Sequence, residues 1–237
     1  MKSKLTPLLL VIGALITTAF VLHPGDSDMS QKFEFKNFNE VIVSSAFNVD
    51  IEQGDVYSME ISGPADLFEG LEVSQEERTL EIGYEKKRKN FGANLLKVKI
   101  VMPALESLDL SGAIKANIKG FKNESLQIDI SGASNCDLNA NINNLKVDIS
   151  GAGNLNLKGS GDLMVINLSG ASNVKARSYQ VKRLNLNMSG AGAAQVYASE
   201  QLDVEVSGVG SVKYDGSPQI LNKKLSGMAT IQPFSEE

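Results

Sequence analysis

The stretch that decides the fold is Ile128-Asp129-Ile130-Ser131-Gly132-Ala133-Ser134-Asn135, because variants of it recur through the second half of the chain. Each variant contains a Ser-Gly pair, whose serine is Ser111, Ser131, Ser150, Ser169, Ser189, Ser207 or Ser226. By subtraction these serines lie 20, 19, 19, 20, 18 and 19 residues apart. An apolar-polar-apolar alternation precedes the first six, and the seventh is degenerate. A period of two nested in a period near 19 is typical of stacked β-coils.

The alternation sorts the side chains of each coil onto two faces. A single coil cannot bury its own apolar face, so we expect neighbouring coils to stack and cover it. Two aliphatic columns then fill the inside: Leu108, Ile128, Val147, Ile166, Leu186 and Val204, and Leu110, Ile130, Ile149, Leu168, Met188 and Val206. The residues between them form an outward polar column: Asp109, Asp129, Asp148, Asn167, Asn187 and Glu205.

The recurring glycines predict a structural corner, where the backbone needs a positive φ or leaves no room for a Cβ. They are Gly112, Gly132, Gly151, Gly170, Gly190, Gly208 and Gly227. The serines, together with Asn135, Asn154 and Asn173, are expected to stack into hydrogen-bonding ladders. Pro233 and Glu236-Glu237 predict a last strand whose open edge is blunted against further pairing.

Residues 33–105 show alternating strands without an obvious period, for example Val41-Ile42-Val43 and Leu80-Glu81-Ile82. This region forms either the first coils or cap of the repeat region 106–237, or a separate domain. The predicted fold class is therefore all-β: a parallel β-helix, or β-solenoid, with coils of about 19 residues, preceded by an irregular β-strand region.

The N-terminus indicates export. Lys2 and Lys4 precede an apolar run over residues 5–22, which is typical of a secretory signal peptide. The run is also close to the length of a membrane span, so residues 1–22 are interpreted as either a cleaved signal or an uncleaved anchor. Residues 23–32 are expected to be a linker. Both alternatives place the folded body outside the cytoplasm, in the periplasm, on the outer membrane surface or outside the cell.

Composition excludes several classes of function. The chain of 237 residues has 23 basic and 28 acidic residues, so a nucleic-acid surface is not expected. Its single cysteine, Cys136, cannot form an intramolecular disulfide or a cysteine-based metal site, and is expected to be buried or to dimerise. The only histidine, His23, precedes the folded region, which removes Ser-His catalysis and most zinc chemistry. No cofactor is predicted.

Two sets of residues are candidates for binding. Asp109, Asp129 and Asp148 are expected at adjacent levels, about 5 Å apart. They form a solvated face, a weak calcium site or a carboxylate pair for glycoside hydrolysis. Three tyrosines recur at intervals of 18 and 17 residues and line one side of the last coils, or serve partly as core: Tyr179, Tyr197 and Tyr214.

The repeated Ser-Gly-Ala-Gly/Ser-Asn units, at residues 131–135, 150–154 and 169–173, resemble the putative auto-transporter adhesin, head GIN domain family. The resemblance covers residues 38–233 and implies an exported bacterial envelope protein with a β-helical fold and no catalytic residues to carry over. We therefore expect a non-enzymatic structural or adhesive module that binds an envelope macromolecule or glycan. The alternatives are a carbohydrate-active β-helix enzyme and a periplasm-facing sensor anchored through residues 5–22.

Overall fold

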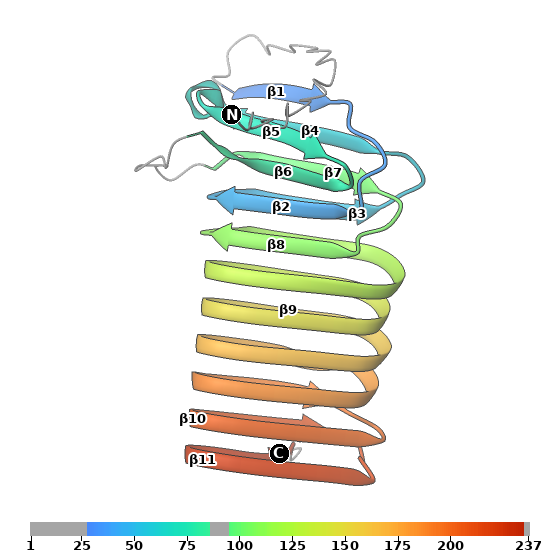
Figure 1. Ribbon diagram of the computed structural model, residues 1–237, viewed down its shortest axis with the longest axis vertical. Helices are drawn as coiled ribbons and strands as arrows, with labels where there is room; N and C mark the ends of the chain where they lie inside the picture. Colours follow the sequence, from blue (N-terminus) through green and yellow to red (C-terminus); the bar gives the residue numbers. More distant parts are fainter. Residues whose placement is uncertain (1–27, 86–94, 235–237) are drawn as a thin grey trace, which may run out of the picture.

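The computed structural model describes residues 28–85 and 95–234, and the chain in these ranges is all-β (Figure 1). Its strands join one 11-stranded sheet, and the short 3-10 helix η1 (Ala65–Phe68) follows β4. The strands are β1 (Asp28–Phe33), β2 (Glu40–Ser45), β3 (Asn48–Gln53), β4 (Ser58–Pro64), β5 (Leu71–Glu76), β6 (Thr79–Tyr84), β7 (Lys97–Met102), β8 (Ser107–Gly112), β9 (Lys115–Tyr197), β10 (Gln201–Asp215) and β11 (Ile220–Pro233).

The predicted signal or anchor, residues 1–22, lies outside the described residues, as does the first part of the predicted linker. Its second part is not a linker, because residues 28–32 belong to β1, which pairs antiparallel with β4. Burial of the Phe33 side chain at the end of β1 helps to hold this strand against the sheet. Within the described ranges, none of the helical structure is long and apolar enough to cross a membrane.

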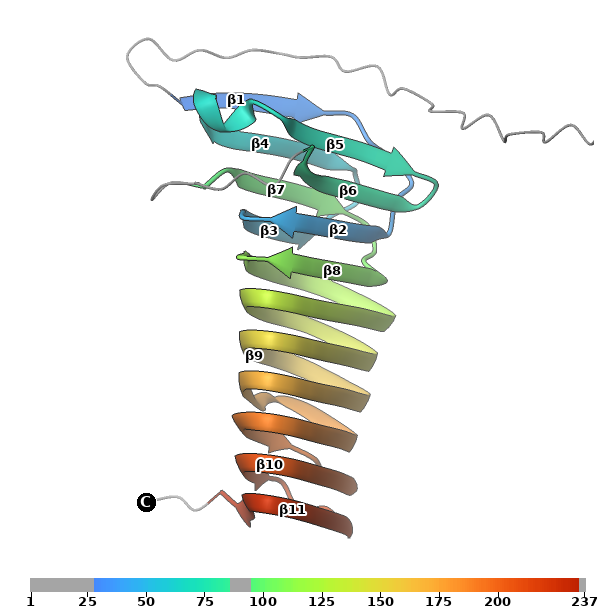
Figure 2. The ribbon, with the colours of Figure 1, turned by 60° about the vertical axis from the view of Figure 1, so that its left-hand side comes forward.

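Consecutive repeats pair in parallel with matching positions aligned. Gly112 on β8 lies opposite Gly132 on β9, Gly190 lies opposite Gly208 on β10, and Gly208 lies opposite Gly227 on β11. The ribbon accordingly descends in stacked turns from β8 to β11 (Figures 1 and 2). Equivalent residues of successive repeats are thus neighbours across the backbone hydrogen bonds of the sheet.

The two aliphatic columns predicted from the alternation fill the space inside the turns. All twelve side chains are buried, and the most exposed of them, Leu168, is 4% exposed. Each such aliphatic side chain contributes about 1.5–3 kcal/mol when fully buried, so the columns are a main source of stability. The first column ends on a charge, because Lys223 on β11 lies opposite Val204.

The corner glycines all have positive φ, from 100° at Gly132 to 137° at Gly208. Gly132 shows why no side chain fits: a Cβ there would lie 2.5 Å from the carbonyl oxygen of Gly112. The same column continues upward to Ser45, which lies opposite Gly112 and has a φ of 93°. Ser45 is therefore the non-glycine member of the corner.

The N-terminal strands continue the same sheet on both sides of the stack. On one side β6 pairs in parallel with β2, and β2 with β8. On the other side β7 pairs in parallel with β3, and β3 with β9. Strands β1, β4 and β5 then add antiparallel pairs at the end of the stack (Figure 2).

Candidate binding groove

A groove of about 510 Å³ follows the outward polar column of the repeats. We call it the repeat groove. Its lining comes from successive turns of β9 with contributions from β8 and β10, so the parallel register places each lining residue. The lining residues are Asp109, Asp129, Ile130, Ser131, Asp148, Ile149, Ser150, Asn167, Leu168, Ser169, Asn187, Met188, Ser189, Glu205 and Ser207.

The polar column within the groove forms a connected ladder. Asn167 donates from its side-chain amide to Asp148 Oδ1 over 2.6 Å, and Asn187 donates to Asn167 Oδ1 over 2.9 Å. Further along, Lys224 Nζ donates to Glu205 Oε1 over 2.6 Å. The groove is therefore graded from carboxylates at the Asp109 end, through amides, to an ion pair beside β11.

The carboxylates of the groove differ in their electrostatic surroundings. Burial, followed by the charge of Asp129 opposite it, raises the pKa of Asp109. Burial also acts to raise the pKa of Asp148, but hydrogen bonds from Asn167 and Lys146 and the charge of Lys146 outweigh it, and that pKa is lowered. The Lys146 ammonium lies 2.9 Å from Asp148 Oδ2. Asp148 is thus held ionised, whereas Asp109 is shifted toward its neutral form.

Lys146 and Gln127 support the carboxylates, and the interpretation of the sequence missed both. Gln127 donates to Asp129 Oδ2 over 2.8 Å, as Lys146 does to Asp148. Each precedes its aspartate by two residues, and a period of two puts both side chains on the same face of a strand. The signal was therefore present in the alternation.

The groove serines bond differently from the expected ladder. Ser169 Oγ donates to the carbonyl of Ile149 over 3.4 Å, and Ser189 Oγ to that of Leu168 over 3.5 Å. These serines reach the backbone of the preceding turn. The asparagine ladder is confirmed: Asn154 donates to Asn135 Oδ1 over 2.8 Å, and Asn173 to Asn154 Oδ1 over 3.5 Å. It lies on a part of the surface outside the repeat groove.

Metal binding finds little support in this arrangement. Over residues 28–85 and 95–234, no group of three or more His, Cys, Asp or Glu side chains is arranged to hold a metal ion. Cys136 is buried, and burial raises the pKa of its thiol to about 12. The Cys136 side chain is thus placed in the core, away from the groove.

The structure does not bring the three tyrosines together. Tyr179 is fully buried, and its hydroxyl donates to the carbonyl and accepts from the N–H of Ile142, each over 3.1 Å. Burial raises the pKa of Tyr179 to about 12. An exposed binding role for Tyr179 is therefore wrong; the residue is part of the core.

The other two tyrosines are out of line with each other. Tyr214 lies opposite Val196, a buried residue, whereas Tyr197 lies opposite Asp215. Because side chains alternate along a strand, Tyr197 and Tyr214 face opposite sides of the sheet. The expected column of tyrosines is consequently not formed, and the repeat groove is the better candidate for binding.

A comparison with known protein families identifies the family of this chain. The model of the family described as "putative auto-transporter adhesin, head GIN domain" matches residues 37–218. The chain belongs to this family. The matched range includes every lining residue of the repeat groove, from Asp109 to Ser207, and ends before β11. Among curated proteins, none matches the sequence significantly.

Several solved structures share the fold of this chain. One is named a putative adhesin from Bacteroides fragilis NCTC 9343, with a TM-score of 0.82, 24% identity, and coverage of 90% of this chain and 100% of that one. A putative adhesin from Parabacteroides distasonis ATCC 8503 has a TM-score of 0.68 and 21% identity, and the match covers 87% of this chain and 97% of that one. A putative lipid binding protein from the same strain has a TM-score of 0.68 and 22% identity, and the match covers 89% of this chain and 98% of that one. At these identities the likeness shows a shared fold.

Proposed function

We propose that this head GIN domain protein is an exported envelope module, a parallel β-solenoid with coils of about 19 residues, that binds an extended neutral glycan along the repeat groove without catalysis. The observation that carries the proposal is the row of carboxylate and amide side chains along the groove, of which Asp148, Asn167 and Asn187 are joined by hydrogen bonds. Export rests on the apolar run at residues 5–22, which acts as a signal or an anchor.

The spacing of the ladder supports an extended, repeating ligand. Successive strands lie about 4.8 Å apart, so equivalent side chains present polar groups at regular intervals. Amide groups both donate and accept, and carboxylates accept, which suits the hydroxyl groups of a sugar. The ligand class therefore follows from the periodicity of the groove.

The charge of the groove narrows the ligand class further. Its ionisable lining residues are all acidic: Asp109, Asp129, Asp148 and Glu205. Such a field repels anionic polymers and tolerates neutral ones. The described lining contains no aromatic side chain, so recognition relies on hydrogen bonds instead of ring stacking.

One observation favours a second candidate function. Asp109, whose pKa is raised by burial and by the charge of Asp129, lies directly opposite Asp129, and two neighbouring carboxyl groups are the arrangement that glycoside hydrolysis uses. Release of reducing ends from a bound glycan would support this alternative. Binding without release supports the module.

The test measures binding of the purified chain to a panel of neutral and anionic surface glycans. We expect saturable binding to a neutral glycan, weakened at least about tenfold by Asn167→Ala, because the middle of the ladder is lost. The matched control is Asn154→Ala, which removes the same side chain from the ladder outside the groove and should leave affinity unchanged. Absence of saturable binding, or an equal loss in both variants, would contradict the proposal.

A further inference from the structure

The last strand, β11, leaves apolar side chains in solvent. Ile220 is 52% exposed, Leu225 is 47% exposed and Met228 is 77% exposed. In the described structure β11 pairs with β10 along one edge only. The other edge therefore offers unpaired backbone N–H and C=O groups to a further strand.

Leu225 is exposed because the interior of the stack is open at this end, whereas Ile220 lies opposite Gln201 and Met228 opposite the exposed Val209, outside the buried columns. Leu221 lies opposite Leu202 and Leu225 opposite Val206, so β11 continues positions that are buried one turn earlier. Lys223 interrupts them, and its ammonium lies 5.1 Å from the centre of the Tyr214 ring. Pro233 removes a donor only at the far end of the strand. The expected blunting is thus partial.

At the opposite end of the stack, the outermost strands also pair along one edge only. In the described sheet β1 and β5 are the terminal members of the strand order, and they lie together at the end away from β11 (Figure 1). Residues 65–77, which include η1 and β5, contain no basic residue and five acidic ones: Asp66, Glu69, Glu72, Glu76 and Glu77. By contrast, β11 contains Lys223 and Lys224 and no acidic residue. The two ends are complementary in charge.

Strand directions are also compatible. β5 runs antiparallel to β6, and β6, β2 and β8 share the direction of the repeat strands that pair with residues 220–227. Stacked end on end, β5 of one copy would meet residues 220–227 of another as an antiparallel partner. Two β11 strands meeting each other would instead bring Lys223 and Lys224 of both copies together, with only Lys224 paired to Glu205, which is unfavourable. Charge therefore selects a head-to-tail arrangement over a tail-to-tail one.

We propose that copies of this protein associate head to tail, with the β11 edge of one copy against the β5 and β1 edges of the next. The contact extends the sheet across the junction, covers the exposed Leu225 and places Lys224, which faces outward, near the outward Glu72 and Glu76. Such a heterologous contact does not close on itself, so it produces linear chains of copies. The proposal is independent of what the repeat groove binds.

The experiment measures the mass of the full-length protein by sedimentation velocity across concentration, at low and high salt. We expect species larger than a monomer that dissociate as salt rises, since charge pairs assist the contact. Lys224→Glu, and separately the pair Glu72→Lys with Glu76→Lys, should each weaken association at least about tenfold. All three changes in one chain should restore it, because the charges are exchanged.

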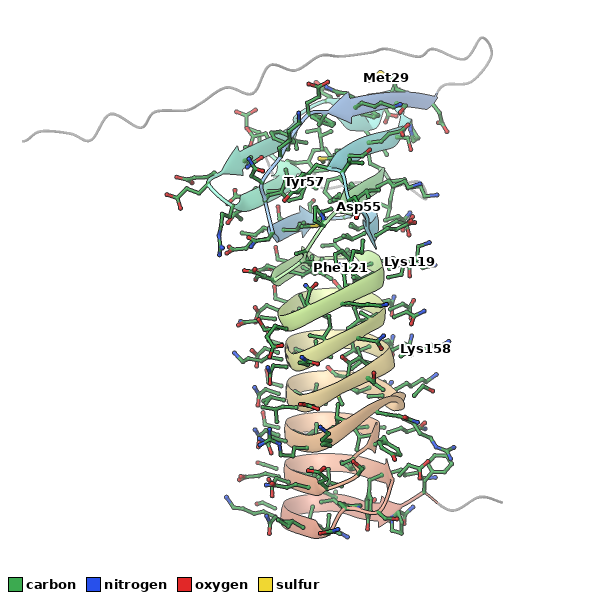
Figure 3. The ribbon with its side chains drawn as sticks, turned by 90° about the vertical axis from the view of Figure 1, so that its right-hand side faces the viewer. Met29, Asp55, Tyr57, Lys119, Phe121 and Lys158 are labelled. Carbon is green, nitrogen blue, oxygen red and sulfur yellow. The ribbon has the colours of Figure 1, made fainter. Side chains whose placement is uncertain are left out.

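Two further variants keep the result decisive. Lys158→Glu makes the same charge change on the side of the stack, far from Met29 on β1 (Figure 3), and should not alter association. Leu225→Asp alters a residue that is 47% exposed at the open end of the stack, opposite Val206, and should weaken association. A wild-type chain that stays monomeric up to about 100 μM, or charge exchange that fails to restore association, would overturn the proposal.

Discussion

The repeat region and the N-terminal strands share one sheet but fix their register by different means. In the repeats each strand pairs with the segment one repeat away, so Val206 lies opposite Met188 and Leu225 opposite Val206. In the N-terminal part β2 pairs with β6 and β8, which are remote in sequence, and antiparallel pairs appear. Periodicity alone therefore specifies pairing in the first region and cannot in the second.

Specific side-chain contacts take over where the period is missing. Aromatic ring pairs join Phe38 to Tyr57 and Phe47 to Tyr84 in the N-terminal strands, with centroids 4.9 Å and 5.4 Å apart. The repeats rely instead on glycine corners stacked on glycine corners. The predictions that follow test this contrast between a region stabilised by repetition and one stabilised by individual contacts.

The largest effect is expected at a corner glycine. Gly151→Ala would place a Cβ 2.4 Å from the Gly132 carbonyl oxygen, at a φ of 133°, so steric overlap adds to backbone strain. We expect a loss of about 3–5 kcal/mol in the free energy of unfolding, measured with urea. Gly70→Ala, in the N-terminal region, also has positive φ but meets no atom within 4 Å, so it should lose about 1 kcal/mol. Equal losses would contradict the role of stacking.

The next effect concerns the buried hydroxyl of Tyr179. Tyr179→Phe leaves both the N–H and the C=O of Ile142 without this partner, at a cost of about 2–3 kcal/mol. Because the folded pKa of about 12 lies above the unfolded value of 10.0, ionisation favours unfolding. The stabilising contribution is thus complete below pH 10 and is lost as pH rises toward 12. The Phe variant should show a shallower alkaline loss, and an unchanged slope would argue against the buried hydroxyl.

Two equivalent serines should respond with opposite sign. Ser134 Oγ donates to the Gly112 carbonyl over 3.2 Å and accepts from the Ile114 N–H over 3.3 Å, whereas the buried Ser172 Oγ has no partner among the described residues. Ser134→Ala should destabilise by about 1 kcal/mol and Ser172→Ala should stabilise by up to about 1 kcal/mol. Thermal melting of both variants measures the difference. A loss in both would show that Ser172 is satisfied.

The smallest effect separates the carboxylates of the repeat groove. Asp148→Asn removes a carboxylate held ionised by Lys146, whereas Asp109→Asn removes one whose charge is disfavoured by burial and Asp129. Near pH 7 we expect Asp109→Asn to be the more stable of the two variants. A lowered pKa stabilises above the unfolded value and the benefit is lost as pH falls, so the difference should shrink in acid. Urea titrations of both variants, near pH 7 and in acid, measure this difference in the free energy of unfolding.

Much of the repeat region could be predicted because each position is sampled several times in one sequence. The columns through Ile128 and Ile130, the glycine corner and the asparagine ladder all follow from matching positions one period apart. The outward acidic column follows in the same way, although its supporting residues Gln127 and Lys146 needed the contacts.

The remaining features depend on what lies across the stack. The inward turn of Tyr179 brings its hydroxyl to the backbone of Ile142, a contact that no periodicity in the chain indicates. Similarly, the sequence pattern predicted a linker where β1 lies, because the partner strand β4 is about thirty residues away and no local pattern reveals the pairing. β5 is only half buried, so its apolar alternation is weak and the sequence pattern did not indicate this strand.

Disulfide trapping tests the central claim, the register of successive repeats, most directly. In a Cys136→Ala background, Asn187→Cys with Glu205→Cys joins opposite residues of adjacent strands, about 4.8 Å apart and within disulfide reach. Asn187→Cys with Asp203→Cys uses the same face shifted by two residues, about 8 Å apart and beyond reach. We predict complete intramolecular oxidation of the first pair and little of the second. Preferential oxidation of the shifted pair would contradict the register on which the whole account depends.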